Sequence, residues 1–213
     1  MMRLRRASVI AALAVGLLVA GCAWTVPKPL LRGGPQPEQV PLRVGVHYPP
    51  ELRKYSYRHH ITDTAYVLGE PSVRLLNEAL GLLFVEVVES PRPGPGVTLR
   101  GDLAGAIEAR IVSAHYKYPT ARSLSWPTQV TYGFTLYSPR GETLASWTVT
   151  GSGGEPFNPN LVVDLPLPLA IASAVSTVRR SFEGAMEEAA SKVISGFRDV
   201  PEIQHWLNEQ GVR

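Results

Sequence analysis

The sequence predicts an α+β domain, built as a two-layer sandwich in which one antiparallel-rich mixed sheet of about five strands carries two main helices on one face. Three observations support this fold class. Segments with alternating apolar residues lie on both sides of a first helical segment, two of them are joined by a short turn, and a long helical segment follows. Each helix has a single apolar stripe, and packing on one sheet face buries both stripes at once.

The first strand is expected in PLRVGVHY, residues 41–48. Leu42, Val44 and Val46 alternate there with polar or small residues, which is typical of a half-buried strand. Residues 49–68 are polar and rich in aromatic side chains, with only local alternation. They are interpreted as an extended loop that contains a short strand near Ala65–Leu68.

The first helix follows this loop. Pro71 suits the first helical turn, and Glu70 beside it complements the helix dipole. Apolar residues recur at helical spacing and form one stripe, which consists of Val73, Leu76, Leu80, Leu83 and Phe84. The chain then turns directly into a strand at residues 84–89, which the proline- and glycine-rich segment SPRPGPG ends.

Three further strands are predicted in the middle of the chain. Residues 106–116 and 128–137 alternate between apolar and polar positions, and so do residues 144–149. SPRG joins the last two segments, with proline and glycine at the positions that a type I turn favours. These two segments therefore predict a β-hairpin.

The C-terminal part is predicted to be helical after one loop. Residues 151–168 include GSGG and are expected to form a flexible loop, because GSGG has the surroundings neither of a nucleophile elbow nor of a phosphate-binding loop. A long helix is predicted from about Leu169 to Phe197, because apolar residues recur there every three or four positions. A short last helix is expected at residues 201–210.

The N-terminal segment has the layout of an export signal. Three arginines precede an apolar run of twelve residues, which is shorter than the ~20 residues of a transmembrane helix. Its end, Val19-Ala20-Gly21-Cys22, resembles the bacterial lipobox, in which small residues precede a cysteine that becomes the mature N-terminus. The resemblance implies cleavage before Cys22 and attachment of a diacylglycerol, usually with a further acyl chain. Two or three chains anchor a protein stably to a membrane.

These features divide the chain into three parts: a lipoprotein signal peptide at 1–21, a lipidated cysteine with a proline-rich tether at 22–41, and a single periplasmic α+β domain at 42–213. At about 3 Å per residue, the tether would span roughly 55 Å. Three of the 21 basic residues lie in the signal peptide, so 18 remain against 18 acidic residues. This neutral balance does not favour a nucleic-acid partner.

A search for reactive residues predicts a protein with no enzymatic activity, no cofactor and no metal. His59, His60 and Asp63 are the strongest metal candidates, but adjacent histidines on a strand point to opposite faces, so they are interpreted as surface residues of a polar loop. Glu187 and Glu188 are neighbours on a helix face exposed to water, which does not suit paired acid–base catalysis.

Aromatic and basic residues suggest a surface that binds a protein. Tyrosine, tryptophan and arginine are enriched at interaction hot spots, and here they gather between residues 48 and 137. The candidates for partner binding are Tyr55, Tyr57, Arg58, Tyr118 and Trp126. The alternative interpretation is that strands simply favour aromatic residues for packing.

The chain resembles small bacterial envelope lipoproteins of the YajG type, whose domain is similar to the N-terminal domain of TolB. The similar segments are PLRVGVH, ALGLLF at a helix end, GAIEARI, YGFTLYSPRGETLASWTVTG and GAMEEAASKVISGF. They cover roughly residues 42–200.

This resemblance implies a non-enzymatic lipoprotein. Ala23 after the cysteine, rather than aspartate, implies sorting to the outer membrane with the domain in the periplasm. The expected role is that of an assembly or accessory subunit of a cell-envelope complex, which offers a sheet edge or an aromatic rim to a protein partner. Two alternatives stay open: an auxiliary lipoprotein of a lipid transport system that binds lipid in an apolar groove, and a glycan- or peptidoglycan-binding protein.

Overall fold

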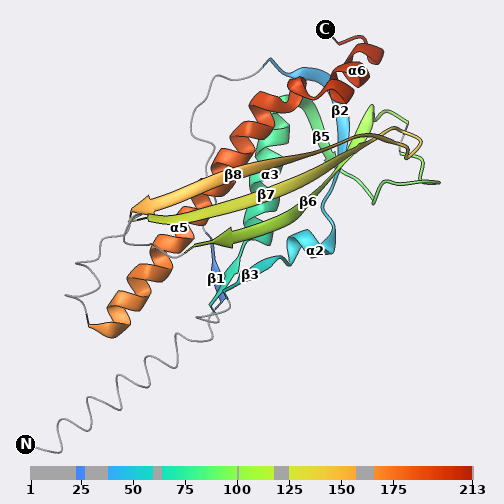
Figure 1. The fold of residues 1–213 in the computed structure, drawn as a ribbon. Coiled ribbons are helices and arrows are strands. Elements are labelled where there is room, and N and C mark those ends of the chain that lie inside the picture. Colours follow the sequence, from blue (N-terminus) through green and yellow to red (C-terminus); the bar gives the residue numbers. More distant parts are fainter. Residues whose placement is uncertain are drawn as a thin grey trace, which may run out of the picture.

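The computed structural model describes residues 23–26, 38–59, 64–99, 101–117, 125–156 and 166–212. The main sheet has five strands in the order β5-β2-β6-β7-β8, and a small second sheet has the order β1-β4-β3. The two long helices, α3 and α5, lie together on one side of the main sheet (Figure 1). This confirms the predicted α+β class and the placement of both helices on one face, and it adds the small sheet.

The elements have the following bounds. The strands are β1 Ala23–Thr25, β2 Val40–His47, β3 Ser56–Arg58, β4 Ala65–Val67, β5 Phe84–Glu89, β6 Gly105–Tyr116, β7 Ser125–Tyr137 and β8 Thr143–Pro156. The helices are α2 Pro50–Arg53, α3 Gly69–Leu83, α5 Leu167–Gly196 and α6 Pro201–Glu209, with a 3₁₀ turn, η1, at Phe197–Asp199.

The main sheet is parallel in one half and antiparallel in the other. β2 pairs in parallel with β5 and β6, whereas β6, β7 and β8 pair antiparallel. The β7–β8 turn is closed by the Gly141 N–H, which donates to the Ser138 carbonyl at 2.9 Å. Gly141 has a φ of 80°, a conformation that glycine adopts without strain. The predicted hairpin is therefore confirmed.

The core lies between the sheet and the two helices. Every second residue of β7 is buried on this side, and the side chains of Tyr132 and Phe134 are at most 2% exposed. The hydroxyl oxygens of Tyr132 of β7 and Ser72 of α3 lie 2.8 Å apart and share a hydrogen bond, which ties α3 to the sheet. Phe134 stacks on Trp147 of β8 at 5.2 Å between ring centroids, and the Trp147 ring meets Phe197 at 6.1 Å.

Residues 49–68 are more ordered than the extended loop that the sequence predicts. They contain α2 and the antiparallel strands β3 and β4, with Leu52 and Tyr66 in the core. The short strand expected near residues 65–68 is confirmed as β4. Elements of three or four residues are too short to show a helical or strand period, so the sequence pattern missed α2 and β3.

The start of the expected tether belongs to the folded domain. Ala23–Thr25 form β1, which pairs in parallel with β4, and Trp24 packs against the core. Val26 after it is 1% exposed. The pairing continues at Val26, whose N–H donates to the Val67 carbonyl at 3.2 Å. Residues 27–37 lie outside the described residues.

The GSGG segment is not the flexible loop that the sequence predicts. β8 continues through Gly151 and Gly153 to Pro156, because α5 packs directly against this part of the strand. A Cβ atom on Gly151 would lie 1.9 Å from the Ala185 carbonyl oxygen, and one on Gly153 would lie 1.9 Å from the Ser181 carbonyl oxygen. These glycines therefore permit a close contact between strand and helix.

This contact predicts a sharp difference between two neighbouring glycines. Gly153→Ala forces its methyl group against the backbone of α5, and overpacking of this kind costs about 1–3 kcal/mol or more. Gly154→Ala is the matched control, because a Cβ atom there meets nothing within 4 Å. Urea unfolding of both variants measures the difference. Equal stabilities would contradict the close packing of α5 on β8.

Candidate functional site

The free edge of β8 is the candidate site. Within the described residues, β8 is paired only with β7, so its other edge faces away from the sheet. The main-chain groups of Thr150 and Ser152 point to this side, since both bond to side chains of α5. Alternate residues of a strand point their N–H and C=O groups the same way, so the groups of Ser146 and Thr148 share this direction.

The C-terminal half of this edge is capped by α5. Lys192 Nζ donates to the Thr150 carbonyl at 2.9 Å, and the Ser152 N–H donates to the carboxylate of Glu188. Lys192 and Glu188 also form an ion pair at 3.1 Å. The hydrogen bond from Ser152, with Lys192 beside it, holds the pKa of the Glu188 carboxyl below its usual range. Covering an edge in this way blocks strand addition.

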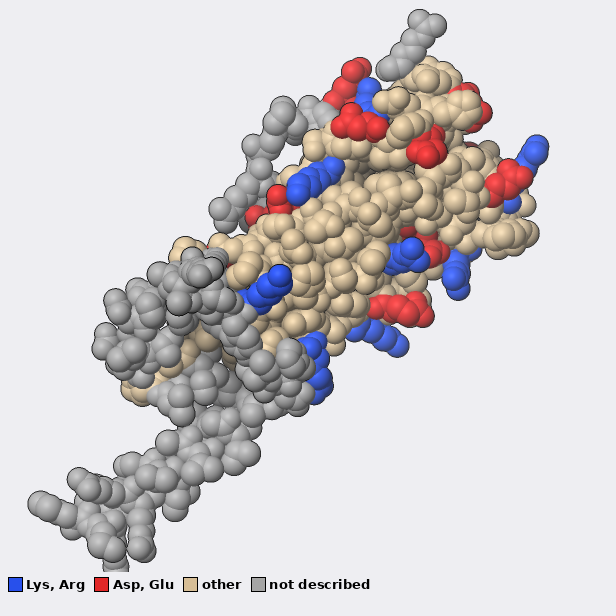
Figure 2. Space-filling model, viewed as in Figure 1, with Lys and Arg blue, Asp and Glu red and all other residues tan. Residues whose placement is uncertain are grey.

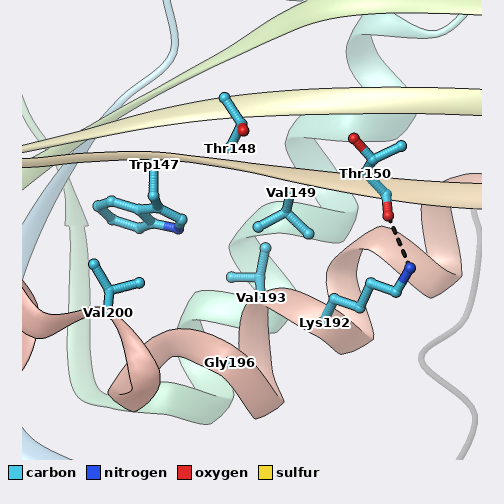
Figure 3. A pocket seen from close by; sticks show the side chains of 8 residues that line it. All are labelled: Trp147, Thr148, Val149, Thr150, Lys192, Val193, Gly196 and Val200. Carbon is cyan, nitrogen blue, oxygen red and sulfur yellow. Dashed lines mark hydrogen bonds between the residues drawn. The ribbon is translucent and has the colours of Figure 1, made fainter.

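The N-terminal half of the edge borders a hollow. Figure 3 shows Trp147 and Val149 of β8 pointing toward the C-terminal end of α5, whereas Thr148 points to the other side of the sheet. The hollow has a volume of about 300 Å³. It is lined by Trp147, Thr148, Val149, Thr150, Lys192, Val193, Gly196 and Val200. In the described part of the chain, no side chain caps the main chain of Ser146 or Thr148 as Lys192 and Glu188 cap their neighbours.

A second hollow continues the first along β8. It has a volume of about 330 Å³ and lies between Leu144 and α6. Its other lining residues are Pro201, Glu202, His205, Trp206 and Glu209. Val200 and Pro201 are adjacent in the chain, so the two hollows are neighbours at the start of α6. We call the two hollows together the β8 groove.

On the outer face of the sheet beside the β8 groove, β7 and β8 present uncharged side chains, whereas Arg110 of β6 lies over Gly133 of β7. Figure 2 shows this face with charged side chains mainly around its margin and other residues across its middle. Hydroxyl groups pair across β7 and β8, with 2.9 Å between the Oγ1 atoms of Thr131 and Thr150. The Ser146 hydroxyl donates to Thr135 Oγ1 at 3.4 Å. The strand face next to the open edge thus presents main-chain groups and hydroxyls, whereas the charged side chains of Lys192, Glu202 and Glu209 line the two ends of the groove.

The aromatic residues predicted to bind a partner do not all lie on an exposed binding surface. The Tyr57 ring lies 5.7 Å from Tyr116 and 5.5 Å from Phe182, so it is part of the packing between the small sheet and α5. Tyr55 is half-buried and packs against the core, and Arg58 is exposed on β3. The side chains of Tyr118 and Trp126 lie outside the described residues. Packing thus explains the position of Tyr57, in agreement with the alternative interpretation that strands favour aromatic residues for packing.

His59 is not the surface residue that the sequence suggests. It is 2% exposed, and its ring stacks on Tyr116 at 4.5 Å between centroids. His60 and Asp63, the other members of the proposed metal cluster, lie outside the described residues. Among the residues that the structure describes, no three His, Cys, Asp or Glu side chains are placed to hold a metal ion.

The space between the sheet and the helices is filled by side chains. Residues from both layers meet there and are at most 2% exposed, namely Leu76, Leu80, Tyr132, Phe134, Phe182, Val193 and Phe197. An apolar groove for a lipid would need open space at this position. Two hollows that described residues line lie at the edge of β8 instead. No helix in that part of the chain is long and apolar enough to cross a membrane.

Comparison with known proteins supports the fold. The crystal structure of a Xanthomonas campestris protein of family DUF330 has a TM-score of 0.52 and 13% identity, and the match covers 89% of this chain and 99% of that one. At this identity the likeness concerns the fold alone. The sequence matches no protein-family model and no curated protein.

Two more distant solved structures carry lipoprotein names. A minor lipoprotein from Acinetobacter baumannii has a TM-score of 0.42 and 8% identity, with 75% of this chain and 96% of that one covered. Rare lipoprotein B from Shewanella oneidensis has a TM-score of 0.36 and 12% identity, with coverage of 74% and 94%. The resemblance to the YajG type and to the TolB domain stays a prediction.

The β8 groove was not among the sequence candidates. The alternation of residues 144–149 places Trp147 on the apolar face of its strand, as the structure does, but alternation does not tell whether that face is fully covered. The sequence feature that could have indicated the groove is Gly196, because a glycine near the end of a long helix leaves space beside it. No Cβ contact lies within 4 Å of this position.

Proposed function

We propose that the chain is a non-enzymatic lipoprotein of the bacterial outer membrane, and that its periplasmic domain binds a protein partner along the open half of the β8 edge. The observation that carries the binding proposal is the β8 groove beside the uncapped main chain of Ser146 and Thr148. The lipobox at Val19–Cys22 supports the anchor, and Ala23 after the cysteine supports the outer membrane.

Strand addition explains why this edge suits a protein partner. Ser146 and Thr148 each present one N–H and one C=O group, so a partner strand gains main-chain hydrogen bonds without any requirement on its sequence. Alternate side chains of that strand then point into the hollow beside Trp147, Val193 and Val200. These apolar surfaces supply the selectivity that the main chain lacks.

Charge at the two ends of the β8 groove favours one direction for the bound strand. Lys192, which is 50% exposed, stands at the Thr150 end, whereas Glu202 and Glu209 line the α6 end. We expect a partner segment with an acidic residue near Lys192 and a basic residue near Glu202. Complementary charges of this kind fix register and orientation more than they raise affinity.

The same features favour a protein over a lipid. A lipid chain needs a continuous apolar cavity, and the space between sheet and helices is filled by Tyr132, Phe182 and Phe197. The β8 groove is open to water and lined in part by charged side chains. These contacts suit an extended peptide better than an acyl chain.

Filling the hollow tests the proposal. Gly196→Leu adds an isobutyl group at a residue that lines the hollow, and its Cβ atom has room, since a Cβ atom at residue 196 meets nothing within 4 Å. Gly184→Leu is the matched control, because this glycine of α5 is equally open and does not line the groove. A photocrosslinking amino acid at Thr148 reports contact with a partner in the native envelope.

We expect a specific crosslinked product at Thr148 that Gly184→Leu retains and Gly196→Leu reduces by about tenfold, the loss that about 1.4 kcal/mol produces. Mass spectrometry of the product identifies the partner. A product of equal yield in both variants, or none at all, would contradict binding at this edge. Recovery of phospholipid with the purified protein, sensitive to Gly196→Leu, would favour the lipid alternative.

Cys22→Ser tests the anchor. Serine has no thiol, so it cannot form the thioether to diacylglycerol, and we expect the variant to leave the outer-membrane fraction and to keep its signal peptide. Density-gradient fractionation and the mass of the N-terminal peptide measure both effects. Unchanged processing and fractionation would rule out the lipid anchor.

A further inference from the structure

The point of lipid attachment lies next to the folded domain. Ala23 is the first residue of β1 and pairs with Ala65 of β4. Cys22 is bonded directly to Ala23, so their Cα atoms are only about 3.8 Å apart. Trp24 packs against the core and Val26 is 1% exposed, which fixes β1 in place. No length of tether therefore separates a lipid on Cys22 from the small sheet.

The N-terminal turns of α5 lie at the same end of the molecule. The small sheet packs on the middle of this helix, where the rings of Tyr57 and Tyr66 lie 5.5 Å from Phe182. From Phe182 the helix extends back to Leu167, a length of about 22 Å at 1.5 Å per residue. Figure 1 shows this part of α5 reaching past the ends of β7 and β8, at the end of the molecule where β1 lies.

The chemistry of these turns suits a lipid surface. The segment LPLAIASAVSTV, residues 167–178, contains no charged residue, and Arg179 and Arg180 follow it directly. Leu169 is 56% exposed and Ala172 is also exposed, whereas Val175 turns toward the protein. An apolar helix end followed by arginines has the charge pattern of the boundary between acyl chains and headgroups. Arg180 is 52% exposed and also pairs with Glu155 at 3.5 Å.

We propose that this end of the domain, formed by the start of β1 and by residues 167–178 of α5, rests in the membrane interface, with Leu169 among the lipids. The inference depends on the proposed lipidation of Cys22 and extends it: the lipid holds the domain at the surface, and α5 fixes its orientation. The β8 groove beside Gly196 lies at the other end of α5, so this orientation points the groove away from the bilayer.

A single fluorescent label tests this orientation. Cys22 is the only cysteine, and lipidation uses its sulfur, so Leu169→Cys in the full chain takes one thiol-reactive fluorophore. Val85→Cys is the matched control, because Val85 is a valine of β5 that is 63% exposed and lies outside the proposed contact. Each labelled lipoprotein is reconstituted into phosphatidylethanolamine–phosphatidylglycerol vesicles, with or without lipids that carry a nitroxide near the headgroup.

We expect nitroxide lipids to quench the label at residue 169 at least roughly two-fold more than the label at residue 85, and aqueous iodide to show the reverse order. Mass spectrometry of the same samples verifies the lipid on Cys22. Equal quenching at both positions on a lipidated chain would overturn the inference and leave the lipoprotein proposal standing. A chain without lipid on Cys22 would overturn both. Protection of residue 169 from both quenchers would show that protein covers it, which also overturns the inference.

Discussion

The contact between α5 and the C-terminal half of β8 determines which part of the β8 edge is capped and which part stays open. Gly151 and Gly153 let the helix backbone approach the strand so closely that a Cβ atom would lie 1.9 Å from a carbonyl oxygen of the helix. At this distance Lys192 and Glu188 reach the strand edge and cap it. Nearer the N-terminal end of β8, the same face of the strand carries the large ring of Trp147 instead of a glycine. Strand and helix are farther apart there, and the edge is uncapped.

This arrangement separates two roles along one helix. Its C-terminal third borders the β8 groove, with Val193 and Gly196 among the lining residues. Its N-terminal third is free of charge and lies at the end of the molecule where β1 begins (Figure 1). A rigid helix of 30 residues, about 45 Å long, thus links the proposed membrane contact to the proposed partner contact. The proposed anchor and the proposed binding edge thus lie toward opposite ends of α5, which suits the proposed role of an accessory subunit that projects from a membrane.

The sequence predicted those parts of the fold that have a long, regular period. The hairpin and both long helices were found because each buries one face for many residues. The strand at residues 84–89 was found because the first helix ends there and SPRPGPG follows. The small sheet was missed because three-residue strands have no measurable period. GSGG was taken for a loop because glycine favours turns, and only the tertiary contact with α5 explains why it continues a strand. The β8 groove depends on where helix and strand diverge, and no local pattern records that.

Amide hydrogen exchange tests most directly whether α5 leaves half of the β8 edge open. If half of the edge is open, the Ser146 and Thr148 amides of the isolated protein exchange rapidly, whereas the Ser152 amide, which donates to Glu188, exchanges slowly, together with the amides that bond to β7. Slow exchange at residues 146 and 148, equal to that at residue 152, would mean that the edge is closed, and the proposed binding site would not exist.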